Sequence, residues 1–246
     1  MIGQRFAGFV GCFGLLVALG VPALAPAAEP ATATKEKQPE TVVPLNRDVP
    51  RHKAINERAA KGDVDLLFLG DSITAGWAGA GKDVWKKYYG DRKAMNAGIG
   101  GDRTQHILWR LDHGNIDGLS PKLVVLMIGT NNLRRNPPKD IALGVKAIVE
   151  KLQKELPKTK VLVLGVFPRG EKPDEDLRKQ QEEINTIIKK LADGKQVHYL
   201  EFNDKLMNED GTQNREIMPD LVHLSPKGYA IWAEAIEPQV AKLLGE

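Results

Sequence analysis

A serine, an aspartate and a histidine occur in this chain in an order that suits nucleophilic acyl transfer. Ser72 ends the stretch Gly-Asp-Ser, and Asp220 and His223 lie three positions apart near the C-terminus. A serine hydroxyl becomes a nucleophile when a histidine takes its proton and a carboxylate holds that histidine in the right tautomer. This spacing lets Asp220 reach Nδ1 of His223 while Nε2 faces Ser72. These three residues are the candidate catalytic group.

Donors for a negatively charged carbonyl oxygen occur in two further loops. Gly101 lies in the glycine-rich stretch 98–102, and a residue without a side chain lets a backbone N–H approach the reacting carbonyl. Asn131 follows Gly-Thr in the stretch 129–132 and offers a side-chain amide. With the N–H of Ser72, these groups are a candidate oxyanion hole.

The elements that must position these loops are indicated by hydrophobic patterning. Five short β-like runs cover 64–69, 93–96, 123–128, 160–167 and 197–200. Apolar residues recur at helical spacing over 141–156, 177–191 and 229–243. The run LVVLMI is apolar without alternation, which is typical of a central strand covered on both faces. We therefore expect a parallel sheet in a three-layer α/β/α sandwich, with ligands bound beyond the carboxyl ends of its strands.

These residues resemble the SGNH, or GDSL, hydrolases, which carry four blocks: Gly-Asp-Ser, a glycine, Gly-x-Asn and Asp-x-x-His. All four occur here in order, as Ser72, Gly101, Asn131 and the pair Asp220 and His223. Within that family, the stretches GIGGDRTQHILWRL, GTNN and VLGVFPRGEKP are most similar to the catalytic subunits of intracellular platelet-activating factor acetylhydrolase. The resemblance covers about residues 63–244.

The resemblance implies a flavodoxin-like fold with five strands in the order 2-1-3-4-5. It also implies that Ser72 attacks an acyl ester, that His223 acts as base and then as acid, and that Asp220 orients His223. The amides of Ser72 and Gly101 and the Asn131 side chain would form the oxyanion hole, without a metal or another cofactor. Acetyl esters are the implied substrates. The resemblance does not imply the alcohol half of the ester. This chain has the pattern of an exported protein, and its loop over 75–87 differs from the corresponding loop of the intracellular enzymes.

The first 28 residues have the pattern of a secretory signal peptide. Arg5 precedes an apolar run over 6–24, and the triplet Ala-Pro-Ala follows as a cleavage site. Glycines and Pro22 interrupt the run, which disfavours a retained membrane anchor. We expect a periplasmic or secreted protein with no stable membrane insertion after cleavage. Residues 29–50, with four prolines, are predicted to form a flexible linker before one hydrolase domain over 51–246.

Composition narrows the class of protein. Of the 246 residues, 42% are hydrophobic and 27% charged, and the formal net charge is +3, which is typical of a globular domain. No run of five like charges is present, so we expect no nucleic-acid partner. Cys12 is the single cysteine, which excludes an intramolecular disulfide framework.

Several of these residues also have simpler interpretations. Ser72 could be only a helix cap, although Asp71 suits that role better and the other three blocks favour a nucleophile. We expect Gly100 to be only a turn glycine. Asn132, rather than Asn131, is expected to bridge loops. The arginines beside the motifs are expected to be ordinary exposed side chains: Arg103, Arg134, Arg135 and Arg169. The remaining histidines lack metal-ligand spacing and are expected to be surface or helix-face residues: His52, His106, His113 and His198. His106 is the one among them that could line the pocket.

The sequence thus predicts a serine esterase that removes a short acyl group, above all acetyl, from a small-molecule, lipid or carbohydrate ester. Three alternatives stay open. A carbohydrate O-deacetylase differs in substrate but not in chemistry. A lysophospholipase or thioesterase would need a longer acyl pocket, and a binding module would keep the fold without turnover.

Overall fold

The structure is a computed structural model, and it describes Gly11 and residues 38–246. The chain divides into two units, Met1–Glu36 and Lys37–Glu246, and every element described lies in the second. The predicted signal peptide over 1–28, apart from Gly11, lies outside the described residues, so cleavage and export stay predictions. Within the described part, no helix combines the length and the apolar character needed to cross a membrane.

Five parallel strands form the sheet, and each lies within or close to one of the predicted runs. They are β1 (Leu66–Gly70), β2 (Ala94–Gly98), β3 (Leu123–Met127), β4 (Lys160–Leu164) and β5 (Val197–Leu200). Their order is β2-β1-β3-β4-β5, which confirms the predicted fold. Gly70 at the end of β1 pairs with Gly98 and with Met127, so the carboxyl ends of the three strands meet at one edge. The candidate loops leave the sheet at this edge.

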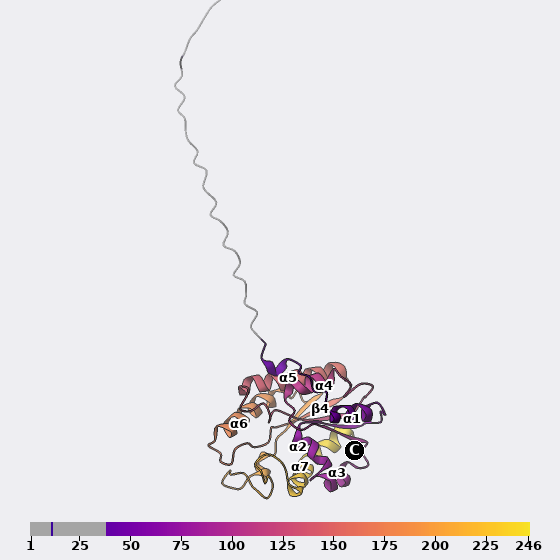
Figure 1. Cartoon of the computed structure of the whole chain (residues 1–246), viewed down its shortest axis with the longest axis vertical. Coiled ribbons are helices and arrows are strands. Elements are labelled where there is room, and N and C mark those ends of the chain that lie inside the picture. Colours follow the sequence, from indigo (N-terminus) through magenta and orange to yellow (C-terminus); the bar gives the residue numbers. More distant parts are fainter. Residues whose placement is uncertain (1–10, 12–37) are drawn as a thin grey trace, which may run out of the picture. The chain divides into compact units, whose positions relative to one another are not determined.

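Helices cover both faces of the sheet, as Figure 1 shows. One core packs α1 (Pro50–Ala59), α4 (Thr104–Leu111), α5 (Pro138–Glu155) and α6 (Asp176–Ile188) on one face, and the other packs α3 (Lys82–Tyr89) and α7 (Pro226–Leu244) on the opposite face. Successive side chains of β1 alternate between them: Leu67 and Leu69 enter the first core, Leu66 and Phe68 the second. Alternation of this kind follows from the pleat of a strand.

The helix that follows the Asp220–His223 stretch begins as its sequence indicates. Ser225 caps α7, since its Oγ accepts a hydrogen bond from the N–H of Gly228 at 3.2 Å, and Pro226 opens the helix. Trp232 packs α7 on the sheet, with its ring centroid 6.3 Å from that of Phe68 in β1. The short elements are η1 (Glu40–Val42), α2 (Ser72–Ala75), η2 (Gly76–Ala78), η3 (Lys189–Leu191) and η4 (Asn203–Leu206).

The described end of the predicted linker packs on the domain. In residues 38–49, here called the N-terminal strap, Thr41 is fully buried and its carbonyl accepts a hydrogen bond from the Thr104 hydroxyl at 2.9 Å. The N–H of Leu45 donates to the carbonyl of Gln105 at 3.0 Å. A Cβ at Gly144 of α5 would lie 2.8 Å from the Thr41 carbonyl, so a glycine is needed for this approach. Proline content indicated a tether, but these contacts join the strap to α4 and α5.

Candidate active site

Ser72 lies at the first turn after β1, and its hydroxyl is not used as a helix cap. Asp71 caps α2 instead, because its Oδ1 accepts a hydrogen bond from the N–H of Ile73 at 2.9 Å. This agrees with the role expected for Asp71. The Oγ of Ser72 lies 2.9 Å from Nε2 of His223, 151 positions further along the chain. The hydroxyl is therefore directed at the predicted base.

Asp220 and His223 form a local turn just before α7. One carboxylate oxygen of Asp220, Oδ2, lies 2.7 Å from Nδ1 of His223. The other, Oδ1, accepts hydrogen bonds from the N–H groups of Val222, at 3.0 Å, and of His223, at 2.7 Å. The structure thus brings Asp220, His223 and Ser72 together in one continuous line of hydrogen bonds.

The charge of Asp220 is stabilised by these bonds. Burial raises the pKa of this carboxyl, but the hydrogen bonds from the His223 ring and from the N–H groups of His223 and Val222 outweigh burial and lower the pKa to about 2. Asp220 is therefore ionised at neutral pH. An ionised partner at Nδ1 fixes the His223 tautomer in which Nε2 accepts a proton.

The loop after β2 brings Gly100, the neighbour of Gly101, close to the serine. Gly101 has a φ of +77°, a backbone conformation that glycine adopts without strain. A Cβ built on the neighbouring Gly100 would lie only 3.9 Å from Cβ of Ser72. Asn131 joins this loop by donating from Nδ2 to the carbonyl of Asp102 at 2.9 Å. An Asn amide has two N–H groups, so this bond leaves one for an oxyanion.

Two neighbours of these residues have supporting roles. Asn132 is buried and accepts a hydrogen bond from the N–H of Thr104 at 3.0 Å, so it bridges loops as expected. His106 is buried as well, and its Nδ1 accepts a hydrogen bond from the N–H of Arg103 at 3.0 Å. Burial, and then the positive charge of Arg103, lowers the pKa of His106 to about 4. His106 is thus a neutral side chain near the site.

Two cavities flank the candidate residues. The first, of about 370 Å³, is lined by Gly101, Arg103, His106, Asn131 and Arg135. The second, of about 310 Å³, lies on the His223 side, and its lining includes Arg134, Arg169, Asp220 and Val222. His106 therefore does line a pocket. Burial, and then the charge of Arg134, lowers the pKa of Arg169, which is not the fully exposed arginine expected from the sequence.

Asp71, next to Ser72, is an unusual carboxyl. It is fully buried, and Oδ2 has no hydrogen-bond partner among the described residues. Burial raises the pKa of Asp71 to about 7, against the opposing effect of the hydrogen bond from Ile73. The group therefore changes its charge near neutral pH.

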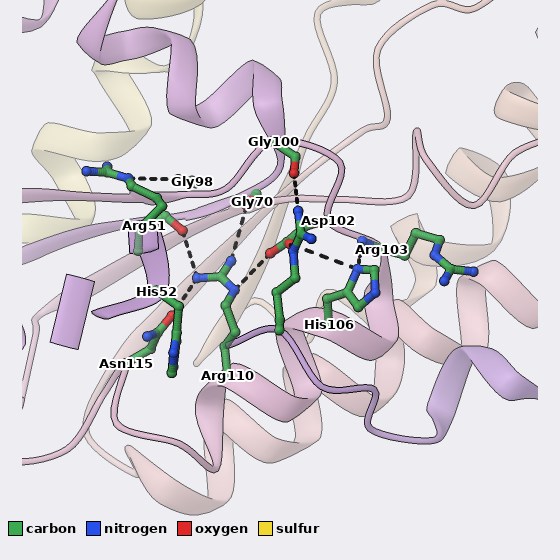
Figure 2. Close-up of polar contacts among 12 residues, drawn as sticks. Arg51, His52, Gly70, Gly98, Gly100, Asp102, Arg103, His106, Arg110 and Asn115 are labelled. Carbon is green, nitrogen blue, oxygen red and sulfur yellow. Dashed lines mark hydrogen bonds and ion pairs between the residues drawn. The ribbon is translucent and has the colours of Figure 1, made fainter. Parts of the chain in front are cut away.

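Sequence reasoning missed three residues that support the loops. Asp102 has a fully buried side chain between two arginines, with Oδ2 at 2.8 Å from Nε of Arg110 and Oδ1 at 2.7 Å from Nε of Arg47. Figure 2 shows Asp102 and Arg110 turned toward each other. The position of Asp102 directly after Gly101 was an available signal, and so was an arginine in the otherwise apolar stretch around Arg110. Nothing in the strap's composition singles out Arg47.

Comparisons with known proteins agree with this fold and identify its family. Residues 68–231 match the GDSL-like Lipase/Acylhydrolase family. The platelet-activating factor acetylhydrolase IB subunit alpha2 of Rattus norvegicus is 36% identical over 186 residues, which cover 74% of this chain and 78% of the relative. A putative acylhydrolase from Bacteroides fragilis superposes with a TM-score of 0.66 at 20% identity, covering 81% of this chain and 100% of the other. An acetylxylan esterase from Geobacillus stearothermophilus gives a TM-score of 0.57 at 19% identity, covering 74% and 94%.

The chain therefore belongs to the GDSL-like lipase/acylhydrolase family. This confirms the resemblance inferred from the four sequence blocks. The two solved structures, at or below 20% identity, support the fold alone. The comparisons show membership of an acylhydrolase family, and the reaction and substrate of this chain are argued from its site.

Proposed function

We propose that this protein is a serine esterase that hydrolyses short-chain esters, above all acetyl esters, through an acyl-enzyme on Ser72. The observation that carries the proposal is the unbroken line from Asp220 through His223 to Ser72, with distances of 2.7 Å and 2.9 Å. Nucleophile, base and orienting carboxylate in this geometry are the requirement of serine acyl transfer. The 36% identical relative is named a platelet-activating factor acetylhydrolase subunit, which supports the acetyl group.

The reaction proceeds in two halves. Nε2 of His223 takes the proton of Ser72 as Oγ attacks the carbonyl carbon. The negative oxygen is bound by the N–H groups of Ser72 and Gly101 and by the Asn131 amide. His223 then gives the proton to the leaving alcohol, and an acyl group remains on Ser72. Water, activated by His223, attacks the acyl-enzyme and releases the acid. Asp220 stays ionised throughout and holds the His223 ring.

Polar cavity walls favour a short acyl group. Both cavities that contain candidate residues are lined largely by charged and amide side chains. A cavity of about 400 Å³ with an apolar lining lies instead between α5 and α6, where it is lined by residues that include Leu143, Ile187 and Leu191. Neither of the two cavities lined by candidate residues therefore offers a long apolar channel, which argues against a lysophospholipase or long-chain thioesterase.

The test is hydrolysis of p-nitrophenyl acetate, butyrate and octanoate by the protein and by Ser72→Ala. We expect a rate that falls steeply with chain length, and a loss of about 10⁶ in kcat in the variant with its fold preserved. Circular dichroism and the melting temperature of the variant are the controls. Equal turnover by Ser72→Ala would refute the nucleophile, and undiminished octanoate hydrolysis would refute the short-acyl preference. No turnover of any ester would favour the binding-module alternative.

A carbohydrate O-deacetylase is the second candidate, because the charged and open cavity walls suit a polar alcohol. One of the fold neighbours is named an acetylxylan esterase. An acetylated xylo-oligosaccharide and a 2-acetyl glycerophospholipid, compared by kcat/KM, separate the two alcohol classes. Equal kcat/KM values for the two substrates would contradict a preference for either class of alcohol.

We propose further that the protein is exported to the periplasm or secreted, on the support of the apolar run over 6–24 and the Ala-Pro-Ala triplet that follows it. The N-terminus of protein recovered outside the cytoplasm is expected to begin just after residue 27 or 28. An intact Met1 in that fraction would contradict cleavage.

A further inference from the structure

Asp102 has a carboxylate that is out of contact with solvent and bound by two arginines. Its side chain is 0% exposed, as is that of Arg110, while that of Arg47 is 24% exposed. Burial raises the pKa of Asp102, and the charges of Arg110 and Arg47 act against this rise. A buried carboxylate is stable only when it is paired. The position of Asp102 therefore depends on these two arginines.

Arg110 joins this carboxylate to the carboxyl ends of two neighbouring strands, β1 and β2. Its Nη1 donates to the carbonyl of Ala97 in β2 at 3.0 Å, and its Nη2 donates to the carbonyl of Gly70, the last residue of β1, at 3.3 Å. Figure 2 shows the guanidinium directed at both Gly70 and Asp102. The loop after β2 is thereby tied to the strand that leads into the nucleophile turn.

Arg47 joins the same carboxylate to the glycine loop. While its Nε binds Oδ1 of Asp102, its Nη2 donates to the carbonyl of Gly100. These two contacts lie on either side of Gly101, whose N–H is the candidate oxyanion donor. On the other side of the loop, the carbonyl of Asp102 accepts the hydrogen bond from Asn131. Arg47 thus binds Gly100 and Asp102, the residues on either side of Gly101. Gly101 carries one oxyanion donor, and Asp102 positions the other, the Asn131 amide.

The strap holds Arg47 in place. The carbonyl of Thr41 and the N–H of Leu45 bond to α4, and the Thr41 hydroxyl donates to the carbonyl of Asp140 at 2.6 Å. Glu40 accepts a hydrogen bond from the Asn136 amide at 2.9 Å. Arg47 therefore reaches the glycine loop from an anchored segment.

We infer that Arg47, in the N-terminal strap, is a positioning residue of the acyl-transfer site. It acts through Asp102 and the glycine loop and does not touch the substrate. Without it, Gly101 and Asn131 lose their fixed distance from Ser72. This inference rests on the proposed function and adds that the strap is part of the active site.

Arg51 provides a matched control. It lies four positions from Arg47, and its Nε and Nη2 also donate to carbonyls of β2, those of Gly98 at 3.3 Å and Asn96 at 2.8 Å. No hydrogen bond between Arg51 and Asp102 is found within residues 38–246. The experiment compares Arg47→Ala, Arg47→Lys and Arg51→Ala in the full chain, with p-nitrophenyl acetate as substrate.

We expect Arg47→Ala to lower kcat by about tenfold to a hundredfold, since a displacement of about 1 Å at a reacting centre has an effect of this size. KM should change by less than about twofold, because the lost interaction belongs to the transition state. Arg47→Lys should recover part of the rate, since a lysine replaces one donor of the guanidinium but not its fork. Arg51→Ala should match the wild type.

Two further measurements separate positioning from simple fold stability. In an Asn131→Ala background, Arg47→Ala should cost less than in the wild type, because one of the groups it positions is already absent. Hydrogen–deuterium exchange of the amides over 100–102 should speed up in Arg47→Ala and not in Arg51→Ala. The exchange experiment needs no turnover, so it tests the inference even if the chain does not hydrolyse these esters.

The inference is overturned by wild-type kcat in Arg47→Ala, by strict additivity with Asn131→Ala, or by unchanged exchange over 100–102. Equal losses of activity in Arg47→Ala and Arg51→Ala, tracking equal drops in melting temperature, would also overturn it in favour of a purely structural role. A wild-type chain without Ser72-dependent turnover would refute the proposed function, and exchange over 100–102 would then decide the inference by itself.

Discussion

The two sides of Ser72 are held in place in opposite ways. On the base side, the side chains of His223 and Asp220 are 49% and 57% exposed, and the bonds of the carboxylate stay within a four-residue turn. On the oxyanion side, Asp102 and Arg110 are fully buried, and the partners come from far apart, with 55 positions between Arg47 and Asp102. One side is a local turn, and the other is part of the core.

This difference has a physical consequence. A solvated turn can lose a side chain at little cost to folding, because water replaces the missing partner. A buried ion pair cannot, because the remaining charge stays in a medium that solvates it poorly. We therefore expect changes on the base side to reduce activity alone, and changes on the oxyanion side to reduce activity and stability together.

Among changes on the two sides of Ser72, the largest effect on activity is expected from Asp220→Asn. The variant keeps the shape of the side chain but favours the wrong tautomer of His223, so kcat should fall by about 10⁴ while the free energy of unfolding stays close to that of the wild type. Steady-state kinetics and urea denaturation measure the two quantities. A large loss of stability in this variant would remove the contrast between the two sides.

Asp102→Asn is the matched change on the oxyanion side. It leaves the guanidinium of Arg110, whose side chain is 0% exposed, without its counter-charge, and we expect a loss of about 3–5 kcal/mol in the free energy of unfolding. Urea denaturation beside Asp220→Asn gives the comparison directly. Similar stability in the two variants would show that the buried pair does not couple the site to the fold.

Asn131→Ala probes the oxyanion side without touching the ion pair. Removing one oxyanion donor costs about 10²–10³ in kcat, and the substrate should bind almost as before. The split between kcat and KM on p-nitrophenyl acetate is the measurement. A variant with raised KM and normal kcat would assign Asn131 to ground-state binding instead.

The last expected effect is a pH dependence of stability from Asp71. Its folded pKa of about 7 lies above the ordinary value of 3.8, so the folded state holds the proton more tightly than the unfolded state. The resulting stabilisation is complete below about pH 4 and is lost as the pH rises to about 7. Asp71→Asn has no titrating group at this position and does not show this loss. The free energy of unfolding of the variant, relative to that of the wild type, should therefore increase as the pH rises from about 4 to about 7. Parallel stability curves for the two proteins would contradict a buried, neutral Asp71.

The same contrast explains what could be predicted from the sequence. The parallel sheet in a three-layer sandwich follows from short apolar runs and crossover rules, whereas the strand order was implied by the family resemblance. The turn at Asp220 and His223 lies within four consecutive residues. Short-range patterns of this kind are readable. The pairing of Asp102 with Arg47 and Arg110 depends on which distant segments the fold brings together, and no local pattern encodes that.

The strap illustrates the limit most clearly. Its prolines and charged residues have the composition of a tether, yet its backbone groups find partners on α4 and a glycine on α5 makes room for it. Whether polar backbone is solvated or docked depends on the surface it meets. That surface is built from residues about 60 to 100 positions away, as for Thr41 with Thr104 and Asp140.

The most direct test of the central claim is fluorophosphonate labelling followed by peptide mapping. We predict a single adduct on the peptide that contains Ser72, formed more slowly in Asp220→Asn and absent in Ser72→Ala. An adduct on another serine, or labelling of Ser72→Ala to the wild-type extent, would contradict Ser72 as the nucleophile.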